Sequence, residues 1–127
     1  MTQKHPSLFD LACSYIGCLN KVGSTDPDHI REPHFSAIWA ENCQKIMNRD
    51  VLYQEGRFFL EQLRDVRKLA GKWQVDLKET ITDNESHMCA IRYDLKSEHF
   101  GTFQVSAFLT FDDQGLLAEI NEVCCKV

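Results

Sequence analysis

Two glutamates interrupt apolar faces of predicted strands, where a carboxylate can act as a proton-transfer base. Glu79 breaks an apolar alternation, and Glu122 follows Ala118 and Ile120 along the last predicted strand. Apolar surroundings disfavour the charged form of a carboxylate, which makes it a useful base near neutral pH. The alternative is that both glutamates lie at the rim of the sheet or in a dimer contact, with their carboxylates in water, because isolated buried carboxylates are costly.

A tyrosine on the first predicted helix is the second group of interest. Tyr15 belongs to an apolar stripe that begins at Leu8 and ends at Leu19, so its hydroxyl faces whatever the helix packs against. One helical hydroxyl on an apolar stripe, facing polar side chains on otherwise apolar strands, is the composition expected of a ligand pocket. Equally, Tyr15 can be a core aromatic residue whose hydroxyl has found a partner.

A predicted meander of four long antiparallel strands, residues 72–127, must position the two glutamates. Each strand is indicated by alternation of apolar and polar residues, since successive side chains on a strand point to opposite faces. On the second strand, Tyr93 lies on the apolar face, which His87 shares. Large apolar residues interrupt the polar, outward-facing positions of these strands. They predict an apolar patch on the outer surface of the sheet, and hence a homodimer. These residues are Met88, Phe108, Leu117 and Val123.

The N-terminal half is predicted to be mainly helical. Ser7 to Asp10 forms a possible capping box for the first helix, and short helices are expected after Asp26 and over residues 34–40. A short strand over residues 43–48 and a helix over residues 56–70 complete the order. Helices that cover one face of an antiparallel sheet make an α+β layered domain, with the space between the layers as the expected cavity.

Composition limits the classes of function. The 127 residues are expected to form one domain, 1–127, and a net charge of −5 makes nucleic-acid binding unexpected. No stretch approaches the roughly 20 apolar residues of a membrane span, and no apolar run follows the N-terminal charges, so we expect no membrane contact and a cytoplasmic location.

The thiols and imidazoles show no spacing typical of metal sites. Six cysteines without C-x-x-C spacing predict reduced structural thiols, and the five histidines form no metal-binding motif. We therefore expect neither a metal nor another cofactor.

Four phrases of the sequence, together with the order of elements, resemble the nuclear transport factor 2-like superfamily, which includes ketosteroid isomerases and SnoaL-like polyketide cyclases. The phrases are SYIGCLNKVGSTD, FSAIWAENCQKIMN, YQEGRFFLEQL and FDDQGLLAEINEV, and the resemblance covers nearly the whole chain. It implies a cystatin-like cone, in which a strongly bent antiparallel sheet wraps around the N-terminal helices and encloses a pocket. It also implies a homodimer formed through the outer surface of the sheet.

The resemblance to ketosteroid isomerases can be followed at three positions. Tyr15 falls at the tyrosine that donates a hydrogen bond to the substrate oxygen. The general base falls at Asn48, whose amide cannot take up a proton, and the second acid falls near Ala107. Because the resemblance makes the first and last strands neighbours, Glu122 is expected near Asn48 as the remaining candidate base. We therefore predict absent or very weak ketosteroid isomerase activity.

Three functions fit these expectations. The first is an isomerase, cyclase or hydratase acting on a small apolar molecule, with Tyr15, Glu122 and Asn48 as candidate catalytic groups. The second is a module without chemistry that binds a ligand or protein, and the third is a fold whose own side chains fill its cavity. The expected ligand-lining residues are Trp39, Glu79, His87, Tyr93, Ala107, Leu109 and Ile120.

Overall fold

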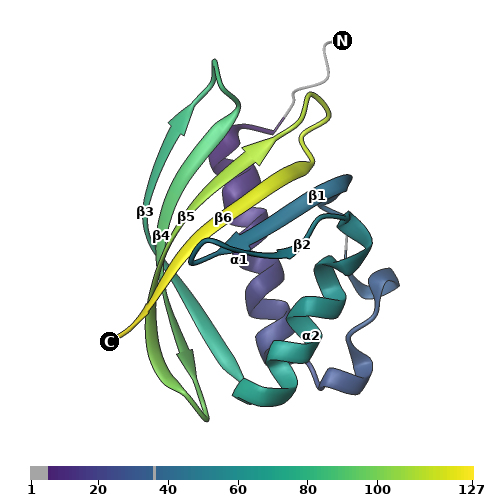
Figure 1. Ribbon diagram of the computed structural model, residues 1–127, viewed down its shortest axis with the longest axis vertical. Coiled ribbons are helices and arrows are strands. Elements are labelled where there is room, and N and C mark those ends of the chain that lie inside the picture. Colours follow the sequence, from purple (N-terminus) through teal and green to yellow (C-terminus); the bar gives the residue numbers. More distant parts are fainter. Residues whose placement is uncertain (1–5, 36) are drawn as a thin grey trace.

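The computed structural model describes residues 6–35 and 37–127. Within these ranges, the helices α1 (Leu8–Ser24) and α2 (Phe59–Ala70) lie on the concave side of one six-stranded sheet, which curves around α1 (Figure 1). Three short 3-10 turns, η1 to η3, complete the helical layer. They are Pro27–His29, Glu32–His34 and Gly56–Phe58. The α+β cone predicted from the sequence is confirmed.

The sheet has the strand order β2-β1-β6-β5-β4-β3. β1 and β6 run parallel, and every other neighbouring pair is antiparallel. The strands are β1 (Trp39–Met47), β2 (Asp50–Tyr53), β3 (Trp73–Asp83), β4 (Met88–Ser97), β5 (Gly101–Phe111) and β6 (Leu117–Lys126). The predicted meander is therefore present as β3 to β6, and the first and last strands are neighbours, as the resemblance implies.

The region before the meander differs from the prediction. The helix predicted over residues 34–40 is wrong, because Trp39 already pairs with Leu117 in the sheet, and strand pairing outweighs the local apolar spacing. β2 was not predicted. It exists because Asn48 and Arg49 both adopt positive φ, 51° and 75°, which is the conformation of a tight two-residue hairpin turn.

Local signals in the sequence fix the start of α1 and the end of α2. The Ser7 hydroxyl accepts a hydrogen bond from the Asp10 backbone N–H (3.1 Å), and the Asp10 carboxylate accepts one from the Ser7 N–H (3.3 Å). The predicted capping box is thus confirmed. α2 ends where Gly71 adopts a φ of 72°, and its N–H donates to the Arg67 carbonyl.

A bulge in β3 reverses which side chains face the helices. Leu77 pairs with Tyr93, but the next register pair is Glu79 with Arg92, so one residue of β3 is extra. Beyond this bulge the phase of the strand is inverted, and Ile81 is 70% exposed. Regular alternation from Trp73, Val75 and Leu77 would place Ile81 on the inner face, and the bulge turns it outward instead.

A second register shift separates the ends of β5 and β6. Phe111 pairs with Leu117 and Thr110 with Glu119, which leaves Ala118 as the extra residue. Leu117 is consequently turned inward and fully buried. Its predicted place on the outer surface is wrong for this reason.

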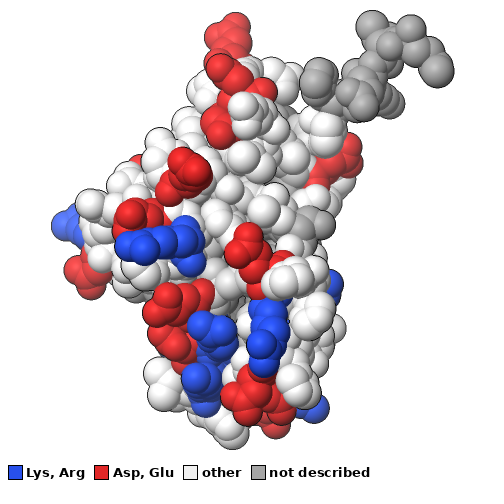
Figure 2. Space-filling view, turned by 90° about the vertical axis from the view of Figure 1, so that its right-hand side faces the viewer, with Lys and Arg blue, Asp and Glu red and all other residues white. Residues whose placement is uncertain are grey.

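Besides Ile81, two large apolar side chains on the outer surface of the sheet remain in solvent. Phe108 and Val123 are each 56% exposed, whereas Met88 is half-buried. On the face shown in Figure 2, acidic and basic side chains are interspersed, and the basic ones do not gather into one patch. None of the described helices combines the length and the apolar character needed to cross a membrane.

Candidate functional site

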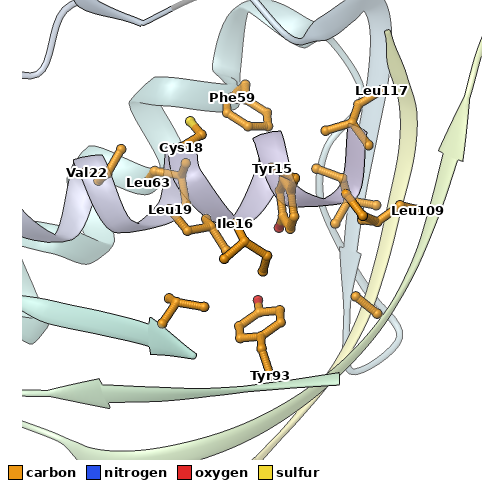
Figure 3. Packing of buried hydrophobic residues seen from close by; sticks show 14 of the residues in the cluster. Tyr15, Ile16, Cys18, Leu19, Val22, Phe59, Leu63, Tyr93, Leu109 and Leu117 are labelled. Carbon is orange, nitrogen blue, oxygen red and sulfur yellow. The ribbon is translucent and has the colours of Figure 1, made fainter. Parts of the chain in front are cut away.

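Glu122 points from β6 into the interior of the cone, where it is 1% exposed. Its Oε2 accepts hydrogen bonds from the hydroxyls of Tyr15, at 3.4 Å, and of Tyr93. The two tyrosine side chains reach toward each other from α1 and β4 (Figure 3). The carboxylate therefore lies in the protein interior rather than in water.

A lysine that the sequence analysis did not single out provides the balancing charge. Lys45 on β1 is 4% exposed, and its Nζ lies 3.3 Å from Glu122 Oε1. The same Nζ donates to Gln62 Oε1 of α2 at 3.0 Å. A buried charge is tolerated when it is paired and hydrogen-bonded, and this pair meets both conditions. We call Tyr15, Lys45, Gln62, Tyr93 and Glu122 the carboxylate cluster.

Donors and acceptors within the carboxylate cluster are closely matched. Glu122 Oε2 accepts hydrogen bonds from the two tyrosine hydroxyls, and Oε1 forms the ion pair with Lys45. The ammonium of Lys45 has three N–H donors. Gln62 Oε1 accepts one of them at 3.0 Å, and Glu122 Oε1 balances the charge at 3.3 Å.

Burial keeps both tyrosine hydroxyls protonated. Loss of solvent raises the pKa of Tyr15 well above its usual value of 10.0, and the negative charge of Glu122 raises it further. The same two causes, in the same order, raise the pKa of Tyr93. At neutral pH both phenols therefore donate to the carboxylate and cannot accept a proton from it.

An apolar pocket opens beside the carboxylate cluster, between α2 and the inner face of the sheet. Its volume is about 180 Å³, and Lys45, Gln62, Tyr93 and Glu122 form the polar part of its wall. The apolar part includes Leu63, Val66, Trp73, Leu95, Phe103 and Val105. An apolar wall with a few convergent polar groups is the usual composition of a small-molecule site.

Tyr15 and Asn48 do not line this pocket. Tyr15 packs edge-on against Phe59 and contacts Glu122 from α1, without lining the pocket. Asn48 lies in the β1–β2 turn, where its side-chain amide donates to the Cys124 carbonyl (3.2 Å) and accepts from the Cys124 N–H (2.9 Å). The Asn48 backbone N–H also donates to the Glu122 carbonyl at 2.9 Å, so the two residues are neighbours as expected, while the side-chain amide bonds to the backbone of Cys124. Lys45 occupies the inner-facing position near this end of β1.

Glu79 is separated from the pocket by the bulge in β3. Its carboxylate is 61% exposed and accepts from Arg92 at 2.9 Å on the outer face of the sheet. Of the two placements considered for Glu79, the one on the inner, apolar face of β3 is wrong, because the bulge moves its side chain to the opposite face, and the one with its carboxylate in water is confirmed.

Trp39 and His87 lie in other parts of the molecule. Trp39 stacks on Phe59, with 4.6 Å between ring centroids, and lines an open surface hollow with Glu41 and Arg57. His87 is half-exposed at the β3–β4 turn, with its Nδ1 4.0 Å from an Asp113 oxygen.

Three further residues predicted to line the ligand pocket are core residues instead. Ala107, Leu109 and Ile120 are at most 2% exposed and are not part of the pocket wall. They belong to the hydrophobic core on the inner face of β5 and β6. Of the predicted site residues, the structure brings together Tyr15, Tyr93 and Glu122.

A pattern in β1 could have revealed Lys45. It shares the strand face of Cys43 and Met47, so a lysine stands where alternation predicts a buried side chain. Gln62 similarly precedes Val66 by one helical turn on the pocket side of α2. In both cases the sequence shows a polar residue at a position where the periodicity of the element predicts a buried, apolar one.

The thiols contribute no activated nucleophile to the interior. All six cysteines are free, and burial raises the pKa of Cys18 and of Cys43 to about 11. Both therefore remain neutral thiols at physiological pH. Among the described residues, no three His, Cys, Asp or Glu side chains are grouped so that they could hold a metal ion.

Comparison with solved structures identifies the fold. An uncharacterised cystatin-fold protein from Novosphingobium aromaticivorans superposes with a TM-score of 0.74 at 13% identity, over 93% of this chain and 98% of the other. A nuclear transport factor 2-like protein of unknown function from Cytophaga hutchinsonii gives 0.72 at 11% identity, over 98% and 95%.

A third solved structure is a candidate isomerase of the SnoaL-like family from Agrobacterium tumefaciens. It gives a TM-score of 0.72 at 13% identity, over 93% of this chain and 97% of the other. No protein-family model matches this sequence, and no curated protein matches it either. At these identities the comparisons establish the fold and leave the chemistry to the site.

Proposed function

Because the chain has the nuclear transport factor 2-like, cystatin-like fold, with a buried carboxylate in the wall of an apolar pocket, we propose that it binds a small, mainly apolar molecule there and transfers a proton on it. The observation that carries the proposal is that Glu122 is 1% exposed and yet lines the pocket. Isomerisation, cyclisation and hydration are the reaction classes that need such a base.

Each member of the carboxylate cluster has a distinct role in this proposal. Glu122 is the base, because in the described part of the chain it is the one carboxylate in the wall of the pocket, and Tyr15, Tyr93 and Lys45 hold it in place. Tyr93 lines the pocket and is the hydroxyl that can donate to a ligand oxygen. Tyr15 lies behind the carboxylate and orients it, so the donor role first expected of Tyr15 passes to Tyr93.

The size of the pocket limits the ligand. A volume of about 180 Å³ is below the roughly 300–1,000 Å³ typical of sites for drug-sized molecules. It is slightly larger than an engineered apolar cavity of about 150 Å³ that holds benzene. A ligand of about one six-membered ring with a short substituent therefore fits, whereas a four-ring steroid does not. This agrees with the prediction that ketosteroid isomerase activity is absent or very weak.

A matched pair of pocket variants tests the proposal. Val66 lines the pocket, so Val66→Trp should fill its mouth, whereas Leu69→Trp changes an exposed position three residues further along α2. We expect benzyl alcohol, followed by saturation-transfer NMR, to bind the wild type and Leu69→Trp but not Val66→Trp. Equal binding by all three proteins would place the ligand elsewhere and contradict the proposal.

A second role concerns the outer surface of the sheet. We propose that the chain forms a homodimer there, because Phe108 and Val123 remain 56% exposed on adjacent strands and Ile81 of β3 is 70% exposed on the same face. Sedimentation velocity should show a dimer for the wild type and a monomer for Phe108→Asp. A monomeric wild type at micromolar concentration would exclude this interface.

A further inference from the structure

The geometry points to a covalent role for Lys45: we propose that its amine forms an imine with a small aldehyde or ketone held in the pocket. This inference rests on the proposed function, since it names the class of ligand that the same pocket takes. The imine can be detected as a covalent adduct on Lys45, whether or not the protein catalyses proton transfer.

Lys45 differs from the other lysines of the described chain in its burial. It is 4% exposed, and it is the one lysine among the buried charged residues of the described ranges. An amine on a flexible stem that is removed from water is the usual setting of Schiff-base lysines. Lys78 offers a contrast, because it is half-exposed and pairs with Asp76 in solvent at 2.8 Å.

The surroundings of Lys45 provide a route for its proton. An ammonium must lose a proton before its nitrogen can attack a carbonyl carbon, and Glu122 Oε1 lies 3.3 Å away to receive it. Gln62 Oε1, at 3.0 Å, fixes the nitrogen from the side of α2. Tyr15 and Tyr93 donate to the other oxygen of Glu122, so Oε1 is left to exchange protons with Lys45.

The reaction balances without an oxidant or a reductant. Glu122 takes one proton from the Lys45 ammonium, and the freed nitrogen lone pair forms a bond to the carbonyl carbon. The carbonyl oxygen gains a proton from the nitrogen and becomes the hydroxyl of a carbinolamine. Glu122 returns its proton to that hydroxyl, water leaves with the C–O bonding electrons, and the nitrogen lone pair closes a C=N bond. Carbonyl compound and ammonium thus give a protonated imine and one water.

Conservation of charge favours this product in the interior. The protonated imine carries the same single positive charge as the ammonium it replaces. The ion pair with Glu122 therefore persists through the reaction, and no unpaired charge is left in the apolar pocket. A neutral product at Lys45 would instead leave Glu122 without its partner.

The probe follows from the pocket volume and from the need for a carbonyl group. Benzaldehyde has one aromatic ring and one aldehyde, which suits a pocket of about 180 Å³. The full chain is incubated with limiting benzaldehyde and cyanoborohydride, which converts an imine into a stable benzylamine. We expect intact-mass spectrometry to find one added benzyl group, and peptide mapping to place it on Lys45 ahead of the exposed lysines.

Two lysine variants act as a matched pair for this experiment. Lys45→Arg keeps the positive charge but cannot form an imine, so the selective adduct should disappear. Lys78→Arg removes an exposed lysine and should leave the adduct on Lys45 unchanged. If Lys45→Arg fails to fold, the peptide map of the wild type still decides the question. Adducts spread over the exposed lysines with Lys45 unmodified would overturn the inference.

Benzyl alcohol separates failure of this inference from failure of the proposed function. It has the same ring but no carbonyl group, so it can occupy the pocket without reacting. Pocket binding of benzyl alcohol with no adduct on Lys45 would refute the imine and leave the binding proposal standing. Absence of both binding and adduct would refute both proposals.

Discussion

The two glutamates that interrupt apolar strands end in opposite environments. Glu122 pairs with Lys45 at 3.3 Å inside the cone, and both side chains are almost fully buried. Glu79 pairs with Arg92 at 2.9 Å on the outer face of the sheet, and both side chains are substantially exposed. The ion pair with the shorter distance is therefore the one in solvent.

This contrast shows that distance alone does not identify an informative ion pair. An exposed pair gains little because water screens it and its side chains lose freedom, so it contributes about 0–1 kcal/mol. A buried pair is tolerated at the cost of desolvation, and removing one partner leaves an uncompensated charge. The buried pair of Glu122 and Lys45 lies in the wall of a pocket, where both groups can act on a ligand. We therefore assign function to Glu122 and not to Glu79.

The largest expected effect is alkaline unfolding of the domain. Burial raises the pKa of all three tyrosines, Tyr15, Tyr53 and Tyr93, above the usual 10.0, so the folded chain keeps their protons when the unfolded chain has lost them. The unfolded state then binds fewer protons, and stability falls as pH rises above about 10. Each tyrosine contributes a loss of about 1.4 kcal/mol per pH unit.

Urea denaturation at pH 9, 10 and 11, followed by far-UV circular dichroism, measures this loss. Tyr15→Phe should lower the slope of stability against pH by the share of one linked proton, about 1.4 kcal/mol per pH unit, while the other two tyrosines and the buried thiols Cys18 and Cys43 keep their contributions. Tyrosinate absorbance that rises near pH 10 while the fold persists would show that the three hydroxyls are accessible and would contradict their burial.

The next effect compares the two glutamates directly. Glu122→Gln leaves the ammonium of Lys45 buried without its counter-charge, so we expect a loss of about 3–5 kcal/mol in the free energy of unfolding. Glu79→Gln is the matched control and should cost about 0–1 kcal/mol. Urea denaturation at pH 7 gives both values. Losses of similar size for the two variants would remove the distinction between the inner and outer pairs.

A smaller effect separates the two hydroxyls that hold Glu122. Tyr93→Phe removes the closer donor to a charged acceptor, for which about 1.5–3 kcal/mol is typical. Tyr15→Phe removes a donor at 3.4 Å and should cost less. Benzyl alcohol affinity should fall in Tyr93→Phe and change little in Tyr15→Phe, because only Tyr93 lines the pocket. The reverse order of affinities would show that Tyr15 is the ligand donor.

Much of the fold was readable from the sequence because local signals agree with the tertiary structure. The capping box at Ser7 and the alternation of β4 to β6 predict elements that the structure contains. Glu122 and Tyr15 were found because each is polar or amphipathic at a position whose neighbours are apolar. A period of two is a reliable guide as long as the strand stays regular.

The rest could not be read because single-residue irregularities change the side of the sheet to which a residue points. The bulge in β3 moves Glu79 to the outer face, and the break of alternation at Glu79 does not by itself distinguish a bulge from a polar residue that faces the pocket. The paired positive φ angles at Asn48 and Arg49 create a hairpin in which Asn48 bonds to β6 backbone. The alternation of β1 marks Lys45 as an inner-facing position, but its burial could not be inferred from it, because a buried lysine needs a partner and Glu122 lies 77 positions along the chain.

The most direct test of the central claim, that the pocket beside Glu122 is the ligand site, is methyl NMR of the full chain titrated with benzyl alcohol. The account predicts saturable shifts confined to methyl groups of the pocket wall, which include those of Leu63, Val66, Leu95 and Val105. Shifts confined to the outer sheet face around Val123, or no saturable shifts at all, would contradict it.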